Sequence, residues 1–354
     1  MTIKTIATRV VLGLAIILIG AIGWTGYRLW NSWSSIPTVD FDPVEARDYL
    51  DTLPPTGDAG ADDDVPDPDV FEFQPPTQQS DDEFDAFLAV GNETQFGGSR
   101  ADVIILFLMP NDGNNPVLVS LPRDLYIENP CTKSPDRINA MLIGCGDEVS
   151  GAELLAVAVE DFTGIEVDHF AIFDFDGFEN VIDTVGGVQI CVSHRTRDTN
   201  VGLQDWELAA GCNVWDGFHA LGWVRSRNTI QLIDGSWRSV PGVSDLVRNQ
   251  RQQDILIQML AKAKRFNTLG RMLDTTRSLA NAFTIDDGLS LRDATELAWD
   301  MRDLDPASIL RLTVPVENFT TSGGAQVLLA TSTFTEVLAE AYPSLVAAPA
   351  AGIG

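Results

Sequence analysis

The sequence predicts an α/β fold, in which a central, mostly parallel or mixed sheet carries helices on both faces and one transmembrane helix precedes the domain. Two observations carry this prediction. From residue 84 onward, short apolar runs alternate with segments of helical periodicity, which is the order of strands and helices in an α/β sandwich. Near the N-terminus, residues 10–27 contain no charged side chain, and the stretch 10–30 is long enough to cross a bilayer as a helix.

The individual elements follow from local patterns along the domain. Residues 102–109 read almost continuously apolar, which indicates a strand buried on both faces. Leu154, Leu155 and Phe162 stand at helical spacing. Ser244 is a favourable N-cap for a long helix ending near residue 265. The predicted strands are 87–90, 102–109, 116–121, 169–173, 188–192 and 309–314, and the predicted helices are 151–163, 176–184, 217–225, 244–265 and two or three within 268–303, before a strand–helix pair at 326–342.

The chain divides into segments of different composition. Lys4 and Arg9 precede the apolar stretch, so its N-terminal side should face the cytoplasm. We predict an uncleaved anchor, with a cleaved signal peptide as the alternative. The location expected is the cell membrane, with a single pass and the domain outside. The segments are a cytoplasmic N-terminus at 1–9, a transmembrane helix at 10–30, a disordered acidic Pro-rich linker at 31–83, an extracytoplasmic domain at 84–342 and a flexible tail at 343–354.

The charge balance excludes one class of partner and suggests another. The chain has 51 acidic and 23 basic residues, a net charge of −28, which argues against binding to nucleic acid because phosphate backbones need a basic surface. Of the basic residues, 19 are Arg, and ten of these lie between Arg100 and Arg251. Because the guanidinium fork suits phosphate and carboxylate, this enrichment predicts an anion site. Structural pairing of Arg with carboxylates is the alternative.

Four cysteines fit a protein exported to an oxidising compartment. They allow three pairings, and we predict the two that join sequence neighbours, Cys131–Cys145 and Cys191–Cys212. A zinc site is not expected, because the chain has no C-x-x-C spacing and only three His residues.

Polar clusters occur at the ends of several predicted elements, where open α/β sheets bind ligands. They occupy residues 99–102, 120–124, 224–227 and 245–253. Arg225 and Arg227 would point to one side if that segment is extended and would diverge if it is helical.

The last cluster has a polar beginning and an apolar continuation along one helix face. Arg248 and Gln252 are four residues apart and share this face, with Asp245 one turn earlier. Ile255 and Met259 continue the same stripe. An amphiphile with an anionic head would match such a surface. Pairing of Arg248 with Asp245 above an ordinary core is the alternative.

Taken together, the motifs resemble those of the LytR-CpsA-Psr family, and the resemblance covers residues 87–260. They stand in the family's order: G-x-E at 91–93, R-x-D at 100–102, S-L-P-R-D at 120–124, R-I-N at 137–139, the stretch 167–188, G-x-x-A-L-x-x-V-R-S-R at 217–227 and D-x-x-R-x-x-R-Q-Q at 245–253.

The resemblance implies an enzyme that acts outside the membrane on glycopolymers linked to polyprenyl pyrophosphate. Such a phosphotransferase moves the polymer with one phosphate to a peptidoglycan hydroxyl, uses Mg²⁺ and has a hydrophobic cavity for the prenyl chain. Forked Arg donors and a metal would neutralise the phosphoryl oxygens. Two alternatives stay open: a polyprenyl-pyrophosphate pyrophosphatase, and a non-enzymatic envelope scaffold or regulator.

Motif matching also assigns residues to roles. Asp102 and Glu93 would bind Mg²⁺, although the family usually has Asp where Glu93 stands. Asp245 would orient Arg248 or act as a base. The catalytic set is Arg123, Arg225, Arg227, Asp245 and Arg248, and the pyrophosphate-binding set is Arg100, Arg123, Arg225, Arg227, Arg248 and Gln252.

Other candidates are interpreted as structural. His169 follows Asp168 in a predicted strand and is expected to be a core histidine, with a catalytic role as the alternative. Four tryptophans could stack on sugars but are expected to pack in the core or loops: Trp206, Trp215, Trp223 and Trp237.

Overall fold

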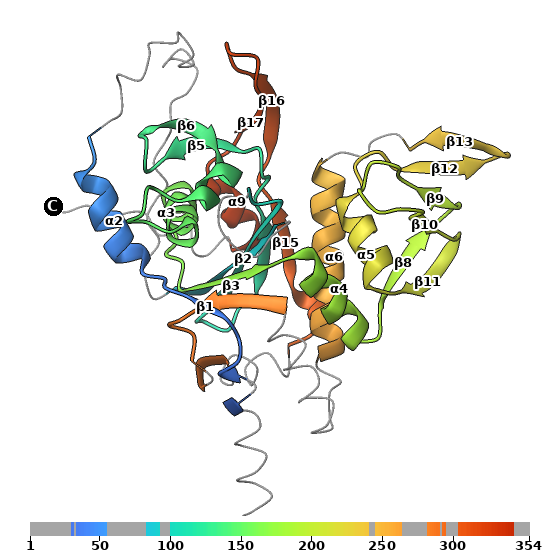
Figure 1. The fold of residues 1–354 in the computed structure, drawn as a ribbon, viewed down its shortest axis with the longest axis horizontal. Coiled ribbons are helices and arrows are strands. Elements are labelled where there is room, and N and C mark those ends of the chain that lie inside the picture. Colours follow the sequence, from blue (N-terminus) through green and yellow to red (C-terminus); the bar gives the residue numbers. More distant parts are fainter. Residues whose placement is uncertain are drawn as a thin grey trace, which may run out of the picture.

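A computed structural model shows a central sheet flanked by helices, with a smaller lobe beside it (Figure 1). The predicted transmembrane helix lies outside the described residues, apart from Trp30, as does the tail beyond residue 342. No helix in the described part of the chain is both long and apolar enough to span a bilayer. The structure describes residues 30–31, 33–54, 83–92, 100–240, 245–263, 282–290, 292–294 and 304–342, with the backbone alone at 245, 246 and 263.

Seven strands form the central sheet, in the order β1-β14-β7-β2-β3-β4-β15. The pairs β1/β14, β2/β7 and β4/β15 run parallel, and the other neighbours run antiparallel. The sheet is therefore mixed, one of the two arrangements that the sequence predicts. The strands are β1 (Thr38–Val39), β2 (Phe84–Gly91), β3 (Val103–Pro110), β4 (Val117–Ser120), β7 (His169–Phe173), β14 (Phe283–Asp286) and β15 (Leu310–Thr313).

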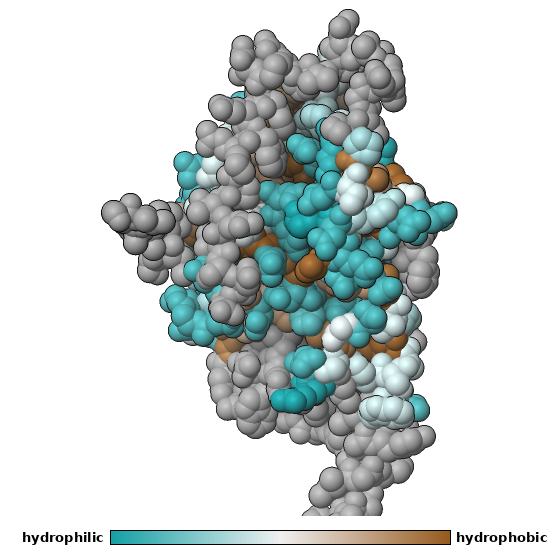
Figure 2. All heavy atoms as spheres, turned by 90° about the vertical axis from the view of Figure 1, so that its left-hand side faces the viewer, coloured by the Kyte–Doolittle hydropathy of each residue, from teal (hydrophilic) through white to brown (hydrophobic). Residues whose placement is uncertain are grey.

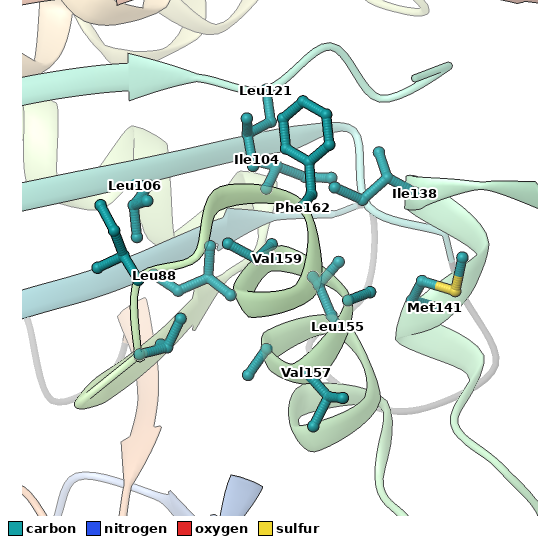
Figure 3. Close-up of a cluster of buried hydrophobic side chains, with 14 of the residues drawn as sticks. Leu88, Ile104, Leu106, Leu121, Ile138, Met141, Leu155, Val157, Val159 and Phe162 are labelled. Carbon is teal, nitrogen blue, oxygen red and sulfur yellow. The ribbon is translucent and has the colours of Figure 1, made fainter. Parts of the chain in front are cut away.

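One face of the sheet packs on α3 (Gly151–Thr163). Ser150 starts this helix with a capping box: its hydroxyl accepts from the N–H of Glu153 at 3.2 Å, and the Glu153 carboxylate accepts from the N–H of Ser150 at 2.8 Å. Figure 3 shows Val159 of α3 beside Leu88 of β2, within the largest buried cluster. The short helix α9 (Phe334–Ala341) joins the same core.

The opposite face is covered by α6 (Asp245–Ala263), so helices lie on both faces as predicted. Ile257 of α6 packs with Ile105 of β3 and Leu118 of β4. Figure 1 shows α6 between the sheet and the smaller lobe, which contains α5 (Gly217–Arg225). Helix α4 (Phe175–Thr184), which precedes α5 in the chain, packs on α5 and contributes to a second hydrophobic core.

Short antiparallel strands build the rest of the molecule, and both predicted disulfides are present. Cys191–Cys212 joins directly paired positions of β8 and β11, and Cys131–Cys145 closes a loop of the main domain. The elements are β5 (Tyr126–Asn129), β6 (Ser134–Arg137), a 3-10 helix (Ile138–Ile143), β8 (Val188–Val192), β9 (Thr196–Arg197), β10 (Glu207–Leu208), β11 (Gly211–Trp215), β12 (Ile230–Ile233), β13 (Ser236–Ser239), a 3-10 helix (Pro306–Ser308), β16 (Val316–Thr320) and β17 (Gln326–Ala330).

The prediction of a disordered linker at 31–83 is wrong for its first part, which contains β1 and α2 (Pro43–Thr52). Within 268–303, where helices are expected, β14 is a strand that the sequence did not predict, residues 292–294 are helical, and most of the stretch lies outside the described residues. Two side chains of α2 are buried, Ala46 and Leu50, and Arg47 forms an ion pair with Glu160 of α3 at 2.9 Å. The four-residue spacing of Ala46 and Leu50 is only a weak signal for a helix inside an acidic segment, so the sequence did not predict α2. Figure 2 shows that the described surface on the α2 side is mainly hydrophilic, with scattered apolar residues.

Candidate functional site

A cavity of about 310 Å³ lies between the sheet and the helices α4, α5 and α6. Most of its wall is apolar and comes from segments that are distant in the sequence. In β2 and β3, alternate residues face the cavity while their neighbours face the α3 core, and Phe173 of β7 lines the cavity next to Ile172 of that core. The apolar lining residues are Ala89, Gly91, Val103, Ile105, Phe173, Phe175, Phe178, Val181, Val201, Leu221, Val224, Leu256, Met259 and Phe283.

Polar side chains line the same cavity, and most of them are residues that the sequence assigns to the site. Four are guanidinium groups, although the chain as a whole carries a charge of −28. An anion is the ligand that this concentration of positive charge favours. The polar lining residues are Asp102, Arg123, Asn200, Arg225, Arg227, Arg248 and Gln252.

Arg123 and Asp102 come together because β3 and β4 are antiparallel neighbours. Asp102 stands just before β3 and Arg123 just after β4, and the guanidinium donates a hydrogen bond to the Asp102 carboxylate. The backbone of Asn139 links both segments, since its N–H donates to the Arg123 carbonyl and its carbonyl accepts from Ala101, both at 3.2 Å. The ion pair therefore has a fixed place at the cavity.

The end of α5 brings Arg225 and Arg227 to the cavity together. The helix stops at Arg225, and Ser226 is extended, with φ −64° and ψ 122°. This settles the alternative left open by the sequence, because an extended Ser226 lets both neighbours face one side. The Arg225 guanidinium also stacks on Phe175, 4.1 Å from the ring centre.

On α6, the motif residues separate into two groups. Arg248 and Gln252 line the cavity, and the amide of Gln252 donates to the carbonyl of Val224 at 3.3 Å. Gln253 turns to the core and donates to the Ser120 hydroxyl at 2.9 Å. Arg251 also turns away, and burial lowers its pKa to about 10. The i, i+4 pair predicted from the sequence is thus the pair at the cavity.

Three predicted residues are not placed there. Arg100 is exposed and is not among the lining residues. Glu93 and the side chain of Asp245 lie outside the described residues, so their roles stay predictions. His169 is partly buried in β7, 3.3 Å from the Asp286 carboxylate.

The tryptophans make packing contacts, as the sequence interpretation expects. Trp206 is buried and donates to the carbonyl of His219 at 3.0 Å. Trp223 lies beneath the Arg251 guanidinium, and Trp237 lies beneath that of Arg197, at 3.7 Å and 4.0 Å from the ring centres.

Several cavity residues were missed by sequence reasoning. Four phenylalanines form much of the wall: Phe173, Phe175, Phe178 and Phe283. Three of them fall in the stretch 167–188 that the family resemblance includes, where the alternation of aromatic and acidic residues was a usable signal. Asn200 stands in a loop without any periodic pattern, so no signal pointed to it.

The donor set at the cavity fits Mg²⁺, which takes one or two carboxylates together with phosphate oxygens and water. Asp102 supplies a carboxylate there. Asn92 follows the lining residue Gly91, is 1% exposed, and its Oδ1 has no hydrogen-bond partner in the described part of the chain. Among the described residues, no three His, Cys, Asp or Glu side chains form a metal cluster.

Sequence comparisons give relatives that are named for cell-wall biosynthesis. The chain is 33% identical over 233 residues to "Probable cell wall biosynthesis protein LcpB" of Corynebacterium glutamicum, a match covering 65% of this chain and 50% of that protein. It is 25% identical over 221 residues to "Polyisoprenyl-teichoic acid–peptidoglycan teichoic acid transferase TagT" of Bacillus subtilis, covering 61% of each. The matches thus span about half to three fifths of these relatives.

Solved structures share the fold. The "LytR-Csp2A-Psr enzyme from Actinomyces oris" superposes with a TM-score of 0.58 at 23% identity, covering 75% of this chain and 96% of the other. "TagT bound to LI-WTA" superposes with a TM-score of 0.55 at 22% identity, covering 78% and 92%.

A family model matches most of the chain. The model described as the LytR_cpsA_psr family matches residues 61–341, which include every described segment that lines the cavity. On this match, the chain belongs to the LytR-CpsA-Psr family.

Proposed function

We propose that this protein transfers a glycopolymer, together with one phosphate, from a polyprenyl-diphosphate carrier to a hydroxyl group of peptidoglycan. One observation carries the proposal: a single cavity has four guanidinium groups and a long apolar wall. A prenyl diphosphate has the matching chemistry, because its head carries several negative charges and its tail is hydrocarbon. The relative TagT of Bacillus subtilis is named for the same kind of transfer.

The cavity residues suit a displacement at phosphorus. The acceptor oxygen forms a bond to the phosphorus that carries the glycan, the bond to the bridging oxygen breaks, and polyprenyl phosphate leaves with that oxygen. Arg123, Arg225, Arg227 and Arg248 would bind the diphosphate oxygens, whose charge must be stabilised as the bond breaks. The hydroxyl proton must pass to a base, for which Asp245 is the residue that the family motif suggests.

Magnesium would add to this stabilisation. Asp102 would hold the ion, with Glu93 as the second proposed ligand. A bound Mg²⁺ would supply positive charge at the phosphoryl oxygens. Asp102 also orients Arg123 through their ion pair, so this carboxylate serves the site with or without the metal.

The proposed location is the outer side of the cell membrane. Residues 10–30 would anchor the chain, with residues 1–9 in the cytoplasm. Substrate supply supports this arrangement, because a polyprenyl carrier lies in the bilayer and peptidoglycan lies outside it. Two disulfides agree with an oxidising compartment.

Mass spectrometry of the reaction product tests the proposal. The full-length protein, in detergent or nanodiscs, is given a lipid-diphosphate-linked glycan, a peptidoglycan oligomer and Mg²⁺. We expect a covalent glycan–phosphate–peptidoglycan product. Release of glycan phosphate without that product would instead identify a pyrophosphatase that uses water as the acceptor.

Variants assign the activity to the cavity. Arg227→Ala and Asp102→Ala should abolish the product. Arg238→Ala is the matched control, because Arg238 lies on the exposed hairpin strand β13 with its side chain 58% exposed. Full activity in both cavity variants would contradict the site assignment, and binding without any turnover in the wild type would favour a scaffold.

A further inference from the structure

A buried carboxylate holds the loop that follows α5. Asp198 is 3% exposed, and its Oδ2 accepts three hydrogen bonds from this loop. The donors are the Ser226 hydroxyl at 2.8 Å and the backbone N–H groups of Arg227 and Asn228 at 3.1 and 2.8 Å. Its Oδ1 accepts from the N–H of Asn200 at 2.8 Å. The carboxylate therefore ties together two backbone segments that both reach the cavity.

Arg251 holds the same loop through different atoms. Its guanidinium donates to the carbonyl of Ser226 and to the hydroxyl of Thr229, both at 3.1 Å, while it stacks on Trp223. The charge of Asp198 raises the pKa of Arg251 and opposes the effect of burial. Ser226 is fully buried, and its hydroxyl and its carbonyl are both engaged.

The fixed residue is the middle one of the Arg225-Ser226-Arg227 motif. Its extended backbone is the reason that both arginines face the cavity. Two guanidinium groups held on one side repel each other. A loop that nothing held in place would therefore lower its free energy by turning one arginine away. A loop held in place before the ligand arrives avoids the ordering cost at binding.

We infer that Asp198 is a positioning residue for diphosphate binding, which fixes the backbone from Ser226 to Asn228 so that Arg225 and Arg227 act on the same anion. This inference rests on the proposed function, because it takes a diphosphate as the ligand. Asp198 itself touches the loop rather than the ligand. Asp198 accepts from the backbone N–H of Arg227, whereas Arg225 is held by α5. Asp198 should therefore affect ligand affinity by positioning Arg227.

The principal variant is Asp198→Asn, which has nearly the same shape. One of the two side-chain positions becomes an NH2 group, so at least one hydrogen bond is lost together with the charge near Arg251. Asp198→Ala removes all four bonds and can fail to fold, so the conservative variant carries the test. Asp254→Asn is the matched control, since its side chain on α6 is 51% exposed and pairs with Arg311.

A double-mutant cycle separates positioning from general stability. The affinity of the full-length protein for geranylgeranyl diphosphate is measured by calorimetry. Asp198→Asn should weaken binding about fivefold in the wild type and have no effect when Arg227→Ala is present, because coupled residues are not additive. In the Arg123→Ala background, the fivefold loss should remain. Asp254→Asn should not change affinity.

A second measurement needs no ligand. Amide hydrogen exchange at Arg227 and Asn228 should become faster in Asp198→Asn and stay unchanged in Asp254→Asn. Unchanged exchange in Asp198→Asn would overturn the positioning role but leave the proposed function standing. An equal loss of affinity in the presence and absence of Arg227→Ala would do the same. If the wild type binds no geranylgeranyl diphosphate, the proposed function fails, and the positioning role fails with it.

Discussion

The guanidinium carbon of Arg225 lies 4.1 Å from the centre of the Phe175 ring, and both side chains line the cavity. The charged part of the site and its apolar wall are thus in direct contact. A ligand whose head binds Arg225 must place the beginning of its tail against Phe175. Substitutions at these two residues should therefore measure separately how the head and the tail of an amphiphile contribute to binding.

Arg225→Lys should weaken geranylgeranyl diphosphate binding about tenfold, because Lys keeps the charge but loses the planar fork. Phe175→Leu should cost less, about threefold, since apolar contact is largely kept and only the stacking is lost. Calorimetry measures both, with Arg238→Lys on the exposed hairpin as the control. Wild-type affinity in Arg225→Lys would show that the fork does not contact the head.

Leu256→Trp should reduce the space for the tail, because Leu256 lies on α6 and lines the cavity. Each CH2 group kept out of an apolar site costs about 0.8 kcal/mol, so excluding two of them weakens binding about tenfold. Inorganic diphosphate has no tail, and its affinity should not change. Val214→Trp, at a position 64% exposed on β11, is the control. An equal loss for both ligands would mean that the variant disturbs the arginines.

Gly222→Ala should destabilise the protein by about 1–3 kcal/mol, as other overpacked sites do. A Cβ atom at this position would lie 2.0 Å from Nε1 of Trp206, which is buried under α5. Chemical unfolding measures the loss. In a Trp206→Leu background the same substitution should cost much less, because the indole is gone. An equal cost in both backgrounds would show that Trp206 is not the obstacle.

The His169–Asp286 pair should make stability depend on pH. Burial lowers the pKa of His169, but the hydrogen bond and charge of Asp286, with the charges of Asp168 and Asp293, raise it overall. Because the pKa of His169 is raised in the folded state, its protonation stabilises the fold. This contribution is complete below about pH 6.5, the pKa of an unfolded-state histidine, and is lost as the pH rises through the pKa of the folded state.

Comparison with His169→Gln isolates this effect. The difference in free energy of unfolding between wild type and variant should be larger at acidic than at alkaline pH. A difference that stays constant with pH would contradict the assignment.

Sequence patterns predicted the parts of the fold that have a strong local period. The strand at 169–173, the helices at 151–163 and 217–225, and the mixed sheet were all found with the expected bounds or order. Strand β14 was missed because its pairing with β7 and β1 is entirely non-local. Helix α2 was missed because the surrounding acidic residues dominate the composition.

The candidate site shows the same limit. Arg248 and Gln252 were paired correctly by helical spacing, since that relation is local. Asp198 was not found, because the partners of its Oδ2 lie 28 to 30 residues away and only the folded loop brings them together. The aromatic wall of the cavity likewise depends on which face of each strand turns toward α6.

With the anchor proposed at residues 10–30, the pairing of β1 with β14 would limit how far the domain can stand from a bilayer. The carbonyl of Pro37 already accepts a hydrogen bond from Ile285, so only residues 31–36 separate the sheet from the proposed anchor at 10–30. Six residues reach at most about 20 Å when fully extended. Residues 55–82 connect α2 to β2 and add nothing to this tether. Lengthening residues 31–36 would therefore lift the cavity away from membrane lipid, whereas the same insertion at 55–82 would leave its height unchanged.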